Sequence, residues 1–316
     1  MPTPTPSPPH PSLLTTLQKT GYLTLPSLLT PPELTALRAA ATHLTTIART
    51  GIWPHVRTVG KQFPPWDASL VPHQAGIWGV QHLLHPDLPI SQAERDAFVG
   101  VYFHKRLLGA VGELLGLDSS SEEEMMTMEL MNMLVRPDGG EGFELCWHRD
   151  DIPASATAEE EVEKLRPKKE KGYGHTQWNL PLFDDESLVV VPGSHRRART
   201  EAERAADPYE KDFPGQVTVK LRAGDVVFYD NNILHRGVYD AARERMTLHG
   251  SVGHAGASRD RARNVLQHGV GDWVDRCDFS GLKDKNQRKT AEGMRRRLVE
   301  LGRENEGKDV GFSLEG

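Results

Sequence analysis

The chain reads Trp147-His148-Arg149-Asp150 near its centre and Leu234-His235-Arg236-Gly237 far downstream. On a strand, alternate side chains point to the same face, so His148 and Asp150 can reach one ion. His235 ends a second apolar stretch, and in a rolled sheet such distant strand ends can meet. Two imidazoles and one carboxylate form the facial set that holds Fe(II) and leaves other coordination positions open. We therefore expect a metal site made of His148, Asp150 and His235.

The apolar pattern from residue 125 onward is that of short strands. The expected strands are 126–135, 143–148, 175–183, 188–191, 217–221, 225–234 and 245–252. Turn-forming pairs such as Pro192-Gly193 and Ala223-Gly224 separate them. Many short strands without alternating helices predict an antiparallel barrel or jelly roll.

The segments around these strands divide the chain into three parts. Residues 1–12 are rich in Pro and Thr and predict a disordered tail. Residues 13–255 predict the main domain, with a strand at 22–25, a helix that begins at Pro31 after the N-cap Thr30, and an amphipathic helix over 91–117. Residues 256–316 predict a C-terminal extension that is partly helical, around 290–302, and packs on the domain.

Two charged insertions, 153–174 and 196–214, interrupt the strand region and are expected to be partly helical. Such runs usually form a solvated surface. A mobile cover over the metal site is the alternative interpretation of these insertions.

Composition narrows the class of protein. The 316 residues are enough for a sizeable core, and the net charge of -6 argues against a nucleic-acid partner. Two cysteines, no membrane-spanning apolar run and no signal peptide predict a cytoplasmic protein. The C-terminal residues 313–316 are not a peroxisomal address. The oligomeric state, monomer or homodimer, stays open.

An open iron needs an electron-donating cosubstrate, and most enzymes with this ligand pattern use 2-oxoglutarate together with O2. The distal carboxylate of 2-oxoglutarate needs a cation, and the arginine fork is the best match. Arg243 lies in a polar turn, whereas Arg245 opens an apolar strand. We therefore expect Arg245 to bind the carboxylate, and Thr247, on the same strand face, to hydrogen-bond it.

Several further motifs resemble the phytanoyl-CoA dioxygenase family of Fe(II)/2-oxoglutarate oxygenases. The resemblance rests on residues 21–26, on Gln177-Trp178-Asn179-Leu180, on residues 189–195 with Pro192-Gly193-Ser194-His195, and on residues 224–228 leading to His235. It runs from about residue 18 to 253. One departure is Phe183-Asp184-Asp185-Glu186-Ser187, where the family often has an Asn-Gly pair.

The resemblance implies a mainly β fold with flanking helices around a double-stranded β-helix (jelly-roll, cupin-like) core. It implies that His148, Asp150 and His235 hold Fe(II) and that Arg245 holds 2-oxoglutarate. Asn132 and Trp178 are further candidates for the cofactor site, because they are polar or aromatic groups on strands near the triad. His195 is expected to close hydrogen bonds in a turn and to stay outside the metal shell.

These observations predict a dioxygenase that hydroxylates an unactivated C–H bond of a small organic substrate and releases succinate and CO2. Desaturation, epoxidation and ring formation depend on substrate pose and stay open. The carboxylate of Asp150 argues against a halogenase, which needs that position vacant for halide. The alternative functions are a metal-binding jelly-roll module without turnover and a cupin-like enzyme that uses another metal without 2-oxoglutarate.

Overall fold

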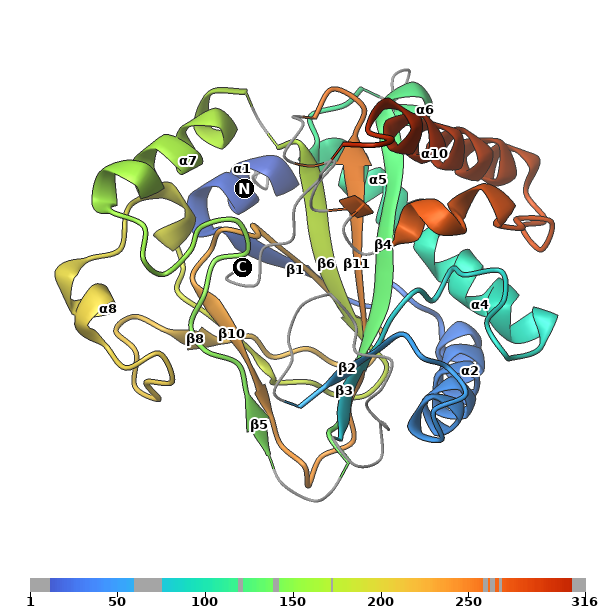
Figure 1. The fold of residues 1–316 in the computed structure, drawn as a ribbon, viewed down its shortest axis with the longest axis horizontal. Coiled ribbons are helices and arrows are strands. Elements are labelled where there is room, and N and C mark those ends of the chain that lie inside the picture. The colour runs from blue at the N-terminus through green and yellow to red at the C-terminus, as the bar shows by residue number, and fades with distance from the viewer. Residues whose placement is uncertain are drawn as a thin grey trace, which may run out of the picture.

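Two antiparallel sheets face each other in the computed structural model (Figure 1). The structure describes residues 12–59, 76–118, 122–138, 142–171, 173–257, 261, 265–266 and 269–308. Residues 1–11 of the expected tail lie outside this part of the chain. The predicted fold, a jelly-roll core with flanking helices, is confirmed.

Seven strands form the larger sheet and four form the smaller one. The larger sheet has the order β1 (Tyr22–Leu25), β9 (Val226–Tyr229), β6 (His175–Pro181), β11 (Met246–His254), β4 (Met126–Val135), β3 (Ile77–Val80) and β2 (Val56–Thr58). The smaller sheet has the order β5 (Phe143–Glu144), β10 (His235–Tyr239), β7 (Leu188–Val190) and β8 (Val217–Thr218).

The inner face of the larger sheet carries a row of polar side chains. In the strand register His249 of β11 lies between Asn132 of β4 and Asn179 of β6. Next to this row, the inner side chains of β9 pack on Leu188 and Val190 of the smaller sheet. The space between the two sheets is therefore partly polar, as a binding site for small charged molecules requires.

Helices cover the opposite, outer face of the larger sheet. They are α2 (Pro31–Arg49), α4 (Gln92–Tyr102), α5 (Lys105–Leu114) and α10 (Lys285–Glu304), and Figure 1 shows α2, α4 and α10 along one side of β4. Their apolar residues join those of the sheet in one large core that includes Trp178, Leu180 and Phe228. This core fixes which side chains point inward.

The remaining helices lie at the rim. They are α1 (Leu13–Thr20), α6 (Glu122–Met125), α7 (Ala158–Lys171), α8 (Glu201–Ala205) and the 3-10 turns Ser194–Arg196, Val270–Asp272 and Val274–Arg276. The Pro-Gly-Ser-His stretch thus forms a turn, as predicted. None of the helices in the described ranges is long and apolar enough to cross a membrane.

Several expected boundaries differ from the structure. The helix predicted over 91–117 is two helices, because His104 ends the first stretch and its side chain caps α5 by accepting a hydrogen bond from the Arg106 amide. Strand β5 stops at Glu144 rather than at 148. His235 begins β10 instead of ending the preceding strand, since residues 230–234 form the turn that changes sheets. The C-terminal helix is longer than predicted and starts at Lys285.

Gly250 of β11 allows the indole of Trp178 to lie flat against the neighbouring strand, because a Cβ at Gly250 would overlap that ring. We expect Gly250→Ala to lower the free energy of unfolding by about 1–3 kcal/mol, as overpacking of a tight core does. Gly100→Ala in α4 is the matched control, since nothing lies within 4 Å of its added methyl. Urea unfolding of both variants tests this, and equal stabilities would contradict the tight packing.

Candidate metal and cofactor site

A backbone bridge brings His148 and His235 together. The amide of His148 donates to the carbonyl of His235 at 3.0 Å, and the amide of His235 returns a hydrogen bond at 3.1 Å. Residues 145–150 do not form a regular strand, so this isolated bridge replaces the strand that the sequence predicted. The two imidazole rings consequently lie with their centroids 4.3 Å apart.

Both imidazoles are held with the same nitrogen facing Asp150. His148 Nδ1 lies 2.8 Å from the carbonyl of Cys146, and His235 Nδ1 lies 2.8 Å from the carbonyl of Ile233. A carbonyl partner requires Nδ1 to carry the proton, which leaves the lone pair on Nε2. Each Nε2 lies 3.6 Å from Asp150 Oδ1. The free lone pairs and the carboxylate therefore converge on one point.

This donor set fits a divalent transition metal. One ligand atom from each of His148, Asp150 and His235 lies within 4.8 Å of the others. Burial, followed by the nearby His235, lowers the pKa of His148 to about 4, so this imidazole is neutral at physiological pH, as a metal ligand must be. Two neutral nitrogens and one carboxylate oxygen are the set that suits Fe(II).

Asp150 is positioned by one residue of the larger sheet, Gln177, and by one residue of the turn that follows β9, Asn231. Its backbone amide donates to the carbonyl of Asn231 at 2.9 Å, and its Oδ2 accepts a hydrogen bond from Gln177 Nε2 at 3.1 Å. Gln177 lies on the inner face of β6. Since Oδ2 is occupied by this amide, Oδ1 is the oxygen that faces the two histidines.

Arg149, between the two predicted ligands, ties the motif to three other segments and was not recognised in the sequence. Its side chain is fully buried. The guanidinium donates to the carbonyls of Ser194 at 3.0 Å, Arg197 at 3.0 Å and Asn232, and it lies 3.5 Å from the Glu161 carboxylate of α7. Burial lowers its pKa to about 10, so it stays charged.

Arg245 lies inside the barrel, on the face that strand parity predicted. Its Nε is 3.3 Å from Asp185 Oδ2, and its guanidinium stacks over the ring of Tyr239, 4.0 Å from the centroid. Thr247 contacts the same Asp185 oxygen. Burial opposes the charge, but Tyr239 and Asp185 outweigh it and raise the pKa of Arg245. Arg245 Nη1 is buried without a hydrogen-bond partner among the described residues.

A further arginine, the half-buried Arg57 of β2, was missed in the sequence. Its guanidinium lies 5.2 Å from the ring centroid of Trp78, and that ring contacts Tyr239 with centroids 5.6 Å apart. Arg57 and Arg245 therefore stack on two adjoining aromatic rings. Burial lowers the pKa of Arg57, while Tyr239 and Asp150 act in the opposite sense, which places its charge within reach of the metal site.

Gln81 is a further polar group that the sequence did not single out. It continues the inner row beyond Asn132, and only 1% of its surface is exposed. Neither its Oε1 nor its Nε2 has a hydrogen-bond partner within the described residues. A buried amide without partners costs free energy, so a ligand between the sheets is the natural partner for it.

The structure brings one of the two other candidates to the site. Asn132 lies on the inner face, where its Oδ1 accepts a hydrogen bond from the His82 amide at 3.0 Å. Trp178 lies on the outer face, with its ring 6.4 Å from that of Tyr102, and so does not reach the space between the sheets. His195 lies apart from the triad, with Nε2 3.1 Å from the carbonyl of Gln18.

Comparison with known proteins gives one family and a set of similar folds. The family model described as phytanoyl-CoA dioxygenase (PhyH) matches residues 17–238. Among curated proteins there is no significant match.

Three solved structures illustrate the likeness in fold. EctD from S. alaskensis with bound Fe superposes with a TM-score of 0.52 at 17% identity, covering 77% of this chain and 75% of that one. EctD from S. alaskensis with 2-oxoglutarate and 5-hydroxyectoine gives a TM-score of 0.51 at 18% identity, covering 76% of this chain and 74% of that one. AviO1 from Streptomyces viridochromogenes Tue57 gives a TM-score of 0.50 at 18% identity, covering 78% of this chain and 95% of that one. At such identities the likeness shows the fold alone.

Proposed function

The chain belongs to the phytanoyl-CoA dioxygenase family of non-haem Fe(II)/2-oxoglutarate-dependent oxygenases, and from that premise we propose that it hydroxylates an unactivated C–H bond of a small organic substrate. The observation that carries the proposal is the convergence of His148 Nε2, His235 Nε2 and Asp150 Oδ1 between the two sheets. Fe(II), 2-oxoglutarate and O2 bound there would supply the oxidising power, with succinate and CO2 as co-products.

The protein's own residues fix the geometry of the metal. The carbonyls of Cys146 and Ile233 hold the two imidazoles in the tautomer that presents Nε2. Gln177 holds the carboxylate of Asp150 in place. His148, Asp150 and His235 would hold the ion from one side and would leave other coordination positions free for a cosubstrate and O2. Because Asp150 supplies the third ligand, hydroxylation is favoured over transfer of a halide.

Arg245 is the residue we assign to the distal carboxylate of 2-oxoglutarate. Its buried Nη1 offers a donor that no described residue uses. Asp185 and Tyr239 hold the guanidinium in one orientation, and Thr247 lies beside it. Arg57, on the adjoining aromatic ring, adds positive charge to the same end of the space. Asn132 completes the inner row beside this proposed cosubstrate site.

Arg245→Met is expected to raise the KM for 2-oxoglutarate by about 10–100-fold with a smaller change in kcat, because a charge-assisted hydrogen bond to the cosubstrate is worth about 1.5–3 kcal/mol. Arg243→Met is the matched control, since Arg243 is 66% exposed in the adjacent turn and should leave the KM unchanged. Equal KM values for the two variants would contradict the assignment.

The Arg245→Met variant also leaves the carboxylate of Asp185 buried beside a methionine. The double variant Arg245→Met/Asp185→Asn removes that charge and restores the fold if the single variant is unstable. It should keep the raised KM, because the cation is still missing.

The proposed activity is tested by release of CO2 from 2-oxoglutarate labelled at its C1 carboxylate. Purified protein reconstituted with Fe(II) in air should release labelled CO2 and form succinate in equal amounts. Without substrate this release should be slow. Omission of Fe(II), or Asp150→Ala, should remove the release. No Fe(II)-dependent release with any of a broad set of small organic compounds would overturn the proposal in favour of a binding module.

A further inference from the structure

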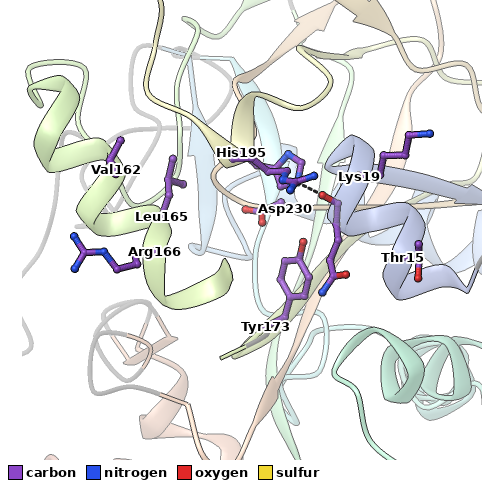
Figure 2. Close-up of a pocket in the computed structure, with 10 residues that line it drawn as sticks. Thr15, Lys19, Val162, Leu165, Arg166, Tyr173, His195 and Asp230 are labelled. Atoms are coloured by element: carbon purple, nitrogen blue, oxygen red, sulfur yellow. Dashed lines mark hydrogen bonds between the residues drawn. The ribbon is translucent and has the colours of Figure 1, made fainter. Parts of the chain in front are cut away.

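A cavity of about 780 Å3 lies between helices α1 and α7 (Figure 2). We call it the α1–α7 cavity. Figure 2 shows Val162, Leu165 and Arg166 of α7 on one side, Thr15 and Lys19 of α1 on the other, and Tyr173, His195 and Asp230 between them. The volume falls within the roughly 300–1,000 Å3 of small-molecule sites.

The lining of the α1–α7 cavity carries more positive than negative charge. Lys19, Arg166 and Arg196 line it, whereas Asp230 is the one carboxylate among the described residues of its lining. The carboxylate of Asp230 already accepts a hydrogen bond from the Asn232 amide at 2.7 Å. Cations exposed to a concave space raise the local concentration of anions.

Arg196 differs from the arginines that follow it. Arg197 is paired with Glu203 at 2.6 Å, and Arg199 is paired with Glu161 at 2.6 Å. These two ion pairs hold the segment 197–199 against α8 and α7. Arg196 lines the α1–α7 cavity and makes no ion pair in the described part of the chain.

An apolar wall faces these charges. Val162 is 50% exposed on α7, and Leu165 and Tyr173 complete this wall. Exposed apolar side chains beside cations suit a ligand that has both an anionic group and an apolar skeleton.

The α1–α7 cavity lies beside a residue that positions Asp150, because Asp230 of its lining directly precedes Asn231, whose carbonyl accepts a hydrogen bond from the Asp150 amide. A smaller void shares Tyr173 and Asp230 with it and extends along β6 to Gln177 and Tyr229. Gln177 is the residue whose amide holds Asp150. The α1–α7 cavity and the void beside Gln177 therefore share the lining residues Tyr173 and Asp230.

We propose that the α1–α7 cavity binds the anionic part of the substrate, a carboxylate or a phosphate ester on an apolar or ring-bearing skeleton, with Arg196 and Lys19 as its cations. This inference rests on the proposed oxygenase function, because it assigns the ligand as the substrate. Such a head group would make charge-assisted hydrogen bonds to Arg196 while the skeleton packs on Val162 and Leu165.

Three naphthalene probes test the charge requirement by calorimetric titration of the full chain. They are 1-naphthyl phosphate, 1-naphthylacetate and the uncharged 2-(1-naphthyl)ethanol. Both anions should bind at one site per chain, at least about tenfold more tightly than the alcohol, and more weakly as salt is added. The two anionic probes show which head group is preferred. Equal affinity for the alcohol, or no binding of either anion, would overturn the proposal.

Variants locate the binding. Arg196→Glu should lower the affinity for both anions about tenfold or more and leave the affinity for the alcohol unchanged, because only the anions would contact the guanidinium. Val162→Trp should lower the affinity for all three probes, because the larger side chain would occupy the space beside the apolar wall. Arg303→Glu is the matched control, because Arg303 is exposed on α10, and it should leave the affinity for all three probes unchanged. Unchanged affinity of the anions for Arg196→Glu would contradict the assigned cation.

The distance of the bound probe from the metal distinguishes a failure of the proposed anion site from a failure of the proposed oxygenase function. With Mn(II) bound to the wild-type protein, the phosphorus of bound 1-naphthyl phosphate should relax faster than it does in the metal-free protein. His148→Ala should remove this effect and keep the calorimetric affinity. Tight anion binding without faster relaxation would show that the cavity is not a substrate site. Faster relaxation without CO2 release from 2-oxoglutarate would keep an anion site near the metal but overturn the proposed function, and with it the assignment of the ligand as the substrate.

Discussion

His148→Ala is expected to abolish Fe(II) binding and with it all Fe(II)-dependent oxidation of 2-oxoglutarate. The imidazole supplies one of three converging donors, and its Nε2 lies 3.6 Å from Asp150 Oδ1. Loss of a residue that merely orients a ligand costs roughly 10–100-fold in metal affinity, so loss of a ligand should exceed about 100-fold. Titration with Fe(II) under argon, monitored by calorimetry, measures this.

His43→Ala is the matched control for the metal experiment. His43 is 51% exposed on α2 and pairs with Glu94, far from the triad in the fold. This variant should bind Fe(II) as the wild type does. Comparable Fe(II) affinity in His148→Ala and His43→Ala would show that the metal, if bound, lies elsewhere.

Glu161→Ala is expected to destabilise the fold by about 3–5 kcal/mol, because removal of one partner leaves buried charges uncompensated. The Glu161 side chain is fully buried in α7 and lies beside three arginines. Its carboxylate is 3.5 Å from Arg149 Nε and 2.6 Å from Arg199 Nη1, and it also contacts Arg204. Urea unfolding monitored by circular dichroism measures the change.

Glu159→Ala is the matched control on the same helix, since Glu159 is exposed and should change stability by less than about 0.5 kcal/mol. A second consequence distinguishes the role of Glu161. Because Arg149 joins Glu161 to the segment that carries His148 and Asp150, Glu161→Ala should also weaken Fe(II) binding. Equal stabilities of the two variants would show that α7 is a solvated surface element and not an anchor of the site.

The residues that the sequence predicted well are those fixed by local spacing. The strand at Tyr22–Leu25 and the strand at Met126–Val135 have the predicted bounds. The interior position of Arg245 follows from strand parity, because one face of an apolar strand must point into the barrel. The structure also brings His148, Asp150 and His235 together, as their motifs predicted.

The sequence could not predict the groups whose role depends on a distant partner. In the sequence, nothing distinguishes Arg149 and Glu161 from surface charges. Their role is visible only in the fold, where α7 packs beside the metal motif. Arg57 lies on a short strand and Gln81 directly follows one, and neither strand has clear alternation, so nothing in the sequence shows that these side chains point inward. Trp178 lies on β6, which is almost wholly buried on both faces, and only the register shows that its ring points outward.

We propose that His148, Asp150 and His235 hold an iron that also binds 2-oxoglutarate. The most direct measurement is the visible absorption of the protein after anaerobic addition of Fe(II) and then 2-oxoglutarate. A weak metal-to-ligand charge-transfer band that appears only when both are present, and that is absent in His148→Ala, is the predicted result. No band in the wild type, or an undiminished band in His148→Ala, would contradict the claim.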